Sequence, residues 1–103
     1  MVNIIIYLEK RHNTKNIIKL LLEEKLIASG SIDENNVFYK LENGSVSEIV
    51  YNVITAQSKS LLFNDIVKLV EGIIGEETPI NSIPIIGSNK IFDNTIRSKT
   101  IPI

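Results

Sequence analysis

The residues with the chemistry to bind a ligand are few and lie scattered along the 103-residue chain. His12 is the single histidine and follows Arg11 in a polar stretch, and Glu76-Glu77 is one of several acidic pairs. A transition-metal site needs several converging ligands. We therefore interpret His12 as a solvated loop residue and predict no metal ligand and no catalytic residue. For Glu76-Glu77 we favour a solvated loop, with a hard-cation site at a subunit boundary as the alternative.

Tyr39 and Lys40 stand in a stretch that we expect to form a hairpin. One interpretation is a pocket between subunits, in which the Tyr39 hydroxyl and the Lys40 ammonium bind a small anion. The other, which we favour, is cross-strand packing by Tyr39 and an edge charge that blocks misassembly. Together with Lys90, these two residues are the candidate ligand-binding residues of the chain, and the sequence names no cofactor.

Composition limits the classes of partner. The net charge is −1 and no basic block is present, so the chain lacks the charge pattern of a nucleic-acid-binding protein. The absence of cysteine excludes disulfides and thiolate metal sites. No apolar run approaches the roughly 20 residues that a membrane span requires, and no signal peptide is evident. We expect one domain over residues 1–103, located in the cytoplasm, with no nucleic-acid or membrane partner.

Hydrophobic periodicity predicts strands and helices in alternation. The expected strands cover residues 2–8, 28–32, 37–41, 46–55 and 83–86. The expected helices cover residues 15–27 and 60–74, and residues 89–98 form either a short helix or an irregular tail. Asp33 to Asn36 reads as a turn, Asn43-Gly44 as a hairpin turn, and Gly75 as the residue that ends the second helix.

The order strand, helix, two strands, helix, strand predicts a ferredoxin-like α+β sandwich, with an antiparallel sheet and two helices on one face. We expect the other face to expose apolar side chains such as Phe38, Val50 or Ile54. An exposed apolar patch usually marks an interface. Because the hairpin is also longer than so small a core can cover, the chain is expected to associate with copies of itself.

One junction carries a family resemblance. The stretch Leu21-Leu22-Glu23-Glu24-Lys25-Leu26-Ile27-Ala28, with Ile32 after it, resembles the end of the first helix in the CutA divalent-cation tolerance proteins. The hairpin residues Phe38-Tyr39 and Glu42-Asn43-Gly44, and later Ile83-Pro84, are similar in a weaker way. The resemblance implies a ferredoxin-like subunit, related to the PII signalling proteins, that forms a homotrimer through its hairpins.

The departures from that family concern its metal chemistry. Ser29 stands where the family has a cysteine, and Thr78-Pro79-Ile80 stands near its His-Pro-Tyr. Soft metal ions prefer thiolate and imidazole donors, and these positions supply neither. We predict a CutA-like, non-enzymatic homotrimer that takes part in the divalent metal-ion response or binds a small ligand between subunits.

Two alternatives remain open. Residues 87–92 resemble a Gly-x-x-Lys-Ile-Phe segment of PII proteins, which suggests a signalling module that binds a nucleotide or small anion through Lys40, Lys90 and Arg97. The second alternative is a ferredoxin-like hydrolase such as an acylphosphatase. For that chemistry Arg11 is the single candidate arginine, and no glycine-rich loop surrounds it.

Overall fold

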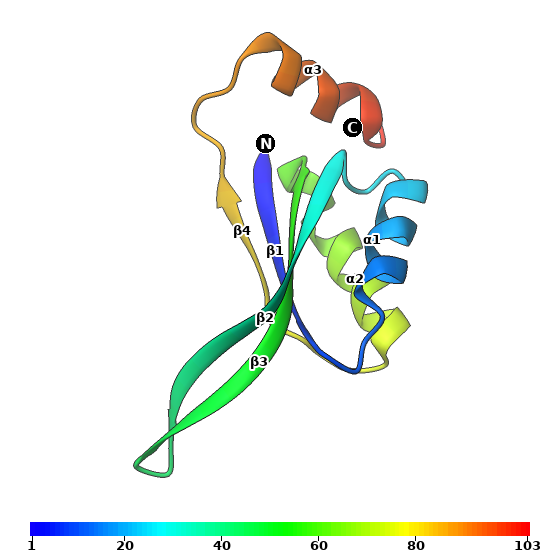
Figure 1. The fold of residues 1–103 in the computed structure, drawn as a ribbon. Helices are drawn as coiled ribbons and strands as arrows, with labels where there is room; N and C mark the ends of the chain where they lie inside the picture. The colour runs from blue at the N-terminus through cyan, green and yellow to red at the C-terminus, as the bar shows by residue number, and fades with distance from the viewer.

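The computed structural model describes residues 1–103 as a four-stranded antiparallel sheet with helices packed against it (Figure 1). The strand order across the sheet is β2-β3-β1-β4, and every neighbouring pair is antiparallel. The elements are β1 (Val2–Glu9), α1 (Thr14–Glu23), β2 (Ser29–Glu42), β3 (Ser45–Ser58), the short 3-10 helix η1 (Ser60–Leu62), α2 (Phe63–Ile74), β4 (Ile80–Pro84) and α3 (Lys90–Lys99). The ferredoxin-like prediction is confirmed.

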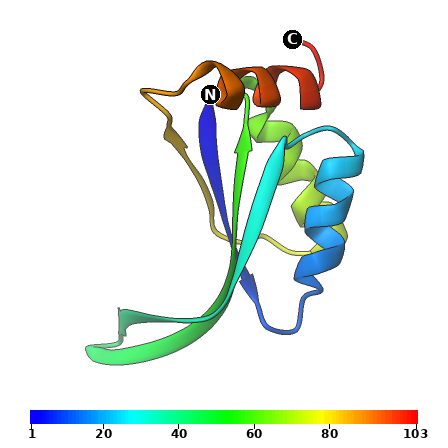
Figure 2. The same cartoon turned by 45° about the horizontal axis from the view of Figure 1, so that its top comes forward.

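Strict alternation in β1 divides the sheet into two faces. Val2, Ile4, Ile6 and Leu8 are buried beneath α1 and α2, which both cover the same face of the sheet (Figure 2). The helices contribute Ile17 and Leu21 from α1, and Ile66 and Val70 from α2. The spacing of four residues within each pair places both of its side chains on one side of the helix. The core therefore lies between one sheet face and two helices.

The third helix covers no sheet face. Helix α3 crosses the end of the sheet where β1 begins (Figure 1), and it buries Ile96 there. The chain after α3 then runs beside the α1–β2 connection, where the Ile101 N–H donates to the Lys25 carbonyl. The helix Lys90–Lys99 thus confirms the first of the two alternatives predicted for residues 89–98.

Several predicted boundaries are wrong. Strand β3 runs to Ser58 rather than Thr55, and β4 ends at Pro84 rather than Ile86. Helix α1 ends at Glu23 rather than near Ile27, because Lys25 adopts a left-handed conformation with φ of 57° that no helix can continue through. Strand β4 begins at Ile80 rather than Ile83. Pairing with β1 starts before Ile83 because the Tyr7 N–H donates to the Pro79 carbonyl at 3.0 Å, directly before Ile80.

The predicted turn at Asp33 to Asn36 is a β-bulge inside one continuous strand, β2. Glu34 and Asn35 together lie opposite Asn52, because Asp33 pairs with Val53 and Asn36 already pairs with Tyr51. Asn35 has φ of 58°, and its N–H donates to the Asn52 side-chain oxygen at 3.0 Å. The turn-forming residues therefore kink the strand without ending it.

The bulge also decides which side chains share a face. Beyond the bulge, Phe38 lies with Tyr7 and Tyr51 on the sheet face that the helices leave open. The three rings contact one another edge to face, with 5.3–5.7 Å between ring centroids. Ile54 was predicted on that face, but it pairs with Ile6 and is fully buried under the helices. Val50 pairs with Val37 and lies on the side of the hairpin opposite Phe38. Of the three predicted residues, only Phe38 was placed correctly.

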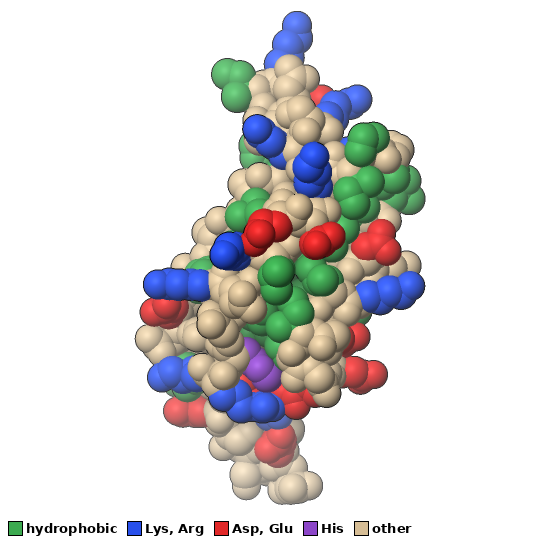
Figure 3. Space-filling model, turned by 90° about the vertical axis from the view of Figure 1, so that its right-hand side faces the viewer, with side chains coloured by type: hydrophobic (Ala, Val, Ile, Leu, Met, Phe, Trp, Pro, Cys, Tyr) green, Lys and Arg blue, Asp and Glu red, His purple; other side chains and the backbone are tan.

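Residues 36–51, which we call the arm, form the far part of the β2–β3 hairpin and project beyond the helices (Figure 1). The arm makes the molecule elongated, with extents of 47 × 28 × 21 Å. At the opposite end, several Lys and Arg side chains gather over α3, at the top of the space-filling view (Figure 3). None of the helices is both long and apolar enough to span a membrane.

Candidate metal centre

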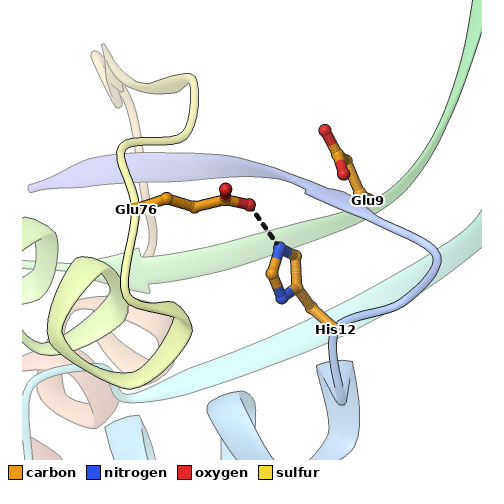
Figure 4. A group of neighbouring side chains, drawn as sticks. All are labelled: Glu9, His12 and Glu76. Atoms are coloured by element: carbon orange, nitrogen blue, oxygen red, sulfur yellow. Dashed lines mark hydrogen bonds and ion pairs between the residues drawn. The ribbon is translucent and has the colours of Figure 1, made fainter.

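Three side chains with metal-binding chemistry meet at the end of the sheet farthest from α3. They are Glu9 at the end of β1, His12 in the β1–α1 connection and Glu76 in the loop after α2. One ligand atom from each lies within 4.8 Å of the others. Figure 4 shows Glu76 reaching across from its loop toward the His12 ring, with Glu9 rising from β1 beside them. We call these three residues the cluster.

His12 is held by a tight turn and a helix cap. Its N–H donates to the Glu9 carbonyl at 3.0 Å, and the next residue, Asn13, caps α1 by accepting from the Asn16 N–H at 3.1 Å. The His12 side chain is only 9% exposed. The prediction of a solvated loop histidine is therefore wrong, because the side chain is largely enclosed and its Nε2 lies 2.9 Å from Glu76 in the loop after α2.

The loop that carries Glu76 is tied to β1. Gly75 ends α2 in the left-handed conformation, with φ of 74°, as its position in the sequence predicted. The Thr78 hydroxyl then donates to the Tyr7 carbonyl, and the Tyr7 N–H donates to the Pro79 carbonyl at 3.0 Å. These bonds on both sides of Tyr7 fix the loop against the end of β1 and bring Glu76 over His12.

Arg11 supplies the positive charge that balances the cluster. Its Nε donates to Glu9 at 2.8 Å and its Nη2 donates to Glu76 Oε1, which also lies 2.9 Å from His12 Nε2. The bond from Arg11, and then the one from His12, holds the pKa of Glu76 below its ordinary value. The bonds from Glu76 and Glu9 raise the pKa of the Arg11 guanidinium. Glu76 is therefore kept ionised, which is the form that binds a cation.

The donor set has a definite chemical preference. One imidazole nitrogen and two carboxylate oxygens suit zinc, nickel or copper ions better than a soft thiophilic ion. A single imidazole with two carboxylates leaves at least one coordination position to water. In the structure Arg11 neutralises Glu9 and Glu76, the two carboxylates that such an ion would bind. Because Arg11 is engaged by both of them, it is poorly placed to act as the phosphate-binding arginine of a hydrolase.

The structure does not bring the predicted ligand residues together within one chain. Tyr39 and Lys40 are neighbours in the arm and therefore point to opposite sides of it. Lys40 pairs with Glu42 at 2.7 Å, and this bond raises the pKa of Lys40 and lowers that of Glu42. Lys90 lies in the first turn of α3, at the other end of the molecule. A site that used all three residues would need more than one subunit.

The cluster was missed because His12 and Glu76 are 64 positions apart in sequence. One signal was available. In the predicted topology β1 and β4 are antiparallel neighbours, so the loop that leaves β1 and the loop that enters β4 lie at the same end of the sheet. The polar residues of both loops could have been considered as one group.

No protein-family model matches the chain, and no curated protein sequence matches it significantly. Solved structures do. The divalent cation tolerance protein CutA1 of Thermus thermophilus superposes with a TM-score of 0.85 at 20% identity, over 97% of this chain and 99% of that one. CutA1 of Oryza sativa gives 0.87 at 15% identity, over 97% and 93%.

A protein described as periplasmic, the divalent cation tolerance protein CutA of Archaeoglobus fulgidus, gives a TM-score of 0.83 at 24% identity, over 96% of this chain and 98% of that one. Whole-chain superposition at such low identity establishes the architecture and leaves the chemistry to this chain's own residues. The chain has the fold of the CutA1 divalent cation tolerance proteins.

Proposed function

We propose that this chain is a CutA-like, non-enzymatic protein of the divalent metal-ion response, and that it binds a transition-metal ion at the cluster. The observation that carries the proposal is the convergence of Glu9, His12 and Glu76 on a CutA1 fold. The proposed location is the cytoplasm. The name of the structural neighbours supports divalent cations as the class of ligand, and the cluster supplies donors for them.

Metal binding at the cluster requires Arg11 to move away. The Arg11 side chain is 60% exposed, and ion pairs this open to water contribute little to stability. A divalent ion offers both carboxylates twice the charge of the guanidinium, and it also uses the His12 nitrogen. Small side-chain rotations then bring the three donors to the bond lengths of about 2.0–2.2 Å that zinc requires. Arg11 is thus a displaceable cation that balances the two carboxylates until a metal ion arrives.

We also propose that the chain acts as a homotrimer. The sheet face opposite the helices is uncovered, and the arm exposes Tyr39, Leu41 and Val46 by 66%, 73% and 72% of their surfaces. Apolar side chains this exposed, on an element with almost no intrachain cover, are characteristic of an interface. Packing against sister subunits would bury them. The number three comes from the CutA resemblance.

Zinc titration by calorimetry tests the metal proposal, with the wild-type protein and three variants. We expect His12→Ala and Glu76→Gln to weaken zinc binding by about tenfold or more, since each removes one ligand. Arg11→Gln should strengthen it, because the competing cation is gone. Glu77→Gln is the matched control, since Glu77 makes none of the ion pairs of the structure.

The contrast between Glu76 and Glu77 separates a built site from general acidity. A nonspecific acidic surface would bind zinc slightly better without Arg11, but it would respond equally to Glu76→Gln and Glu77→Gln. Equal effects of those two variants, or zinc binding that survives His12→Ala unchanged, would contradict the proposal.

A further inference from the structure

A cavity of about 460 Å³ lies at the end of the molecule opposite the cluster. The segment after β3 contributes Lys59, Ser60 and Leu61 to its walls, and α3 contributes Arg97. Met1 before β1, and Pro102 and Ile103 after α3, complete the lining. Figure 2 shows how α3 crosses this end of the sheet and forms a roof over it. The volume falls in the range of about 300–1,000 Å³ that small-molecule sites occupy.

The polar side of the cavity is cationic. Lys59 and Arg97 line it, and no acidic side chain does. Lys59 Nζ donates to the Ile101 carbonyl at 2.8 Å, and Arg97 Nε donates to Asp93 at 2.9 Å. Each bond uses one donor and orients the side chain, so two ammonium hydrogens and the terminal guanidinium nitrogens remain for a ligand.

Ser60 adds a neutral donor to the cavity. Its side chain lines the same cavity as Lys59 and Arg97. A serine hydroxyl carries one O–H donor that rotates to suit its partner. The Ser60 hydroxyl can therefore donate to an anion that Lys59 and Arg97 attract.

The remaining wall is apolar. Leu61 is 76% exposed although it is a large hydrophobic residue, and Pro102 also lines the cavity. An inorganic anion would leave the apolar surface of Leu61 and Pro102 exposed to water. A ligand that combines an anionic group with an organic body would bind both walls.

We propose that this cavity binds a small organic phosphate. The phosphate group contacts Lys59, Arg97 and Ser60, and the organic body packs on Leu61 and Pro102. Arginine, lysine and a serine hydroxyl form a donor set that matches phosphate oxygens. The site lies at the other end of the sheet from the cluster, so it is independent of metal binding.

Calorimetric titration with two probes, inorganic phosphate and phenyl phosphate, tests the proposal. Both carry the same ionisable group, and only phenyl phosphate has an apolar body. We expect phenyl phosphate to bind the full-length protein more tightly, by about tenfold for one buried ring face. Leu61→Ser should remove most of that difference and leave the affinity for inorganic phosphate unchanged.

Charge variants test the anionic side. Lys59→Gln and Arg97→Gln should each weaken phenyl phosphate binding by about tenfold to a hundredfold, as expected for a charge-assisted hydrogen bond. Lys68→Gln is the matched control, because Lys68 is a lysine of α2 that does not line the cavity. Arg97→Lys should give an intermediate affinity, since it keeps the charge and loses the planar fork.

Three results would overturn the proposal. They are no binding of phenyl phosphate at millimolar concentration, equal affinity for the two probes, and an equal loss in Lys68→Gln. Thermal unfolding of each variant without ligand identifies any variant that fails to fold, and Arg97→Lys then carries the test. A negative result here leaves the zinc titration of the cluster unaffected.

Discussion

His12 Nε2 lies 2.9 Å from the Glu76 carboxylate, although one residue leaves β1 and the other precedes β4. The same carboxylate accepts a bond from Arg11. Two cationic or potentially cationic groups thus converge on one oxygen at the surface. These bonds link the two loops at one end of the sheet. Because they depend on an ionised Glu76, lowering the pH is a direct test of the link.

We predict that acid weakens the link between these loops. Arg11 and His12 lower the pKa of Glu76 in the folded state below its ordinary value of 4.5. A carboxylate whose folded pKa is depressed contributes stability above its unfolded pKa, and the contribution is lost as pH falls through the folded pKa. Chemical unfolding between pH 7 and pH 3 should therefore show a smaller acid-side loss for Glu76→Gln than for wild type, and a wild-type loss for Glu77→Gln.

The core prediction concerns Ile54, which is fully buried beside Ile6. Ile54→Ala should lower the free energy of unfolding by about 2–5 kcal/mol, because it removes apolar contacts and leaves a cavity. Ile86→Ala should change it by less than about 0.5 kcal/mol, since Ile86 is 100% exposed. Urea unfolding at one fixed protein concentration measures both. Similar losses in the two variants would contradict the burial assigned to Ile54.

Gly30 makes room for Ile18 of α1. A Cβ added at Gly30 would lie 2.8 Å from Ile18 Cδ1, which is the far end of a flexible side chain. We expect Gly30→Ala to cost about 1 kcal/mol of stability through overpacking. The double variant with Ile18→Val should recover part of that loss, and a double-mutant cycle by urea unfolding measures the coupling. Strict additivity of the two changes would contradict the proposed contact.

The arm should hold the assembly together. Leu41 and Val46 pair across the arm and are 73% and 72% exposed in the single chain. Leu41→Glu should shift the mass measured by light scattering from three chains to one, because a buried unpaired carboxylate is costly. Circular dichroism should show the fold unchanged. Ile91→Glu, at a site 79% exposed on α3, is the control that should leave the mass unaffected.

Short-range patterns predicted most of the fold. The β-branched run of β1, the three-and-four spacing of α2 and the left-handed Gly75 depend on neighbours in sequence, and each was placed to within a few residues. The boundaries that failed depend on distant partners. Strand β4 starts where the Tyr7 N–H bonds the Pro79 carbonyl, and no sequence signal within residues 80–84 predicts that pairing.

The bulge and the cluster were missed for the same physical reason. Asp33 to Asn36 has the composition of a turn, and its conformation is decided by Asn52, which is 17 positions from Asn35. The partner of His12 is likewise distant in sequence, since Glu76 lies in the loop after α2. Each polar stretch has the composition of an isolated loop, whereas the fold brings these stretches together in pairs.

The bulge gives β2 one residue more than the partner strand uses, and that surplus sets the direction of the arm. Deleting Asn35 would leave Phe38 opposite Ile49, because the tight turn at Asn43-Gly44 fixes the register from the far end. The local bend and extra twist would disappear with the surplus residue. Loss of the single codon for Asn35 would thus change the direction of the whole arm, while every side chain on the arm kept its cross-strand neighbour.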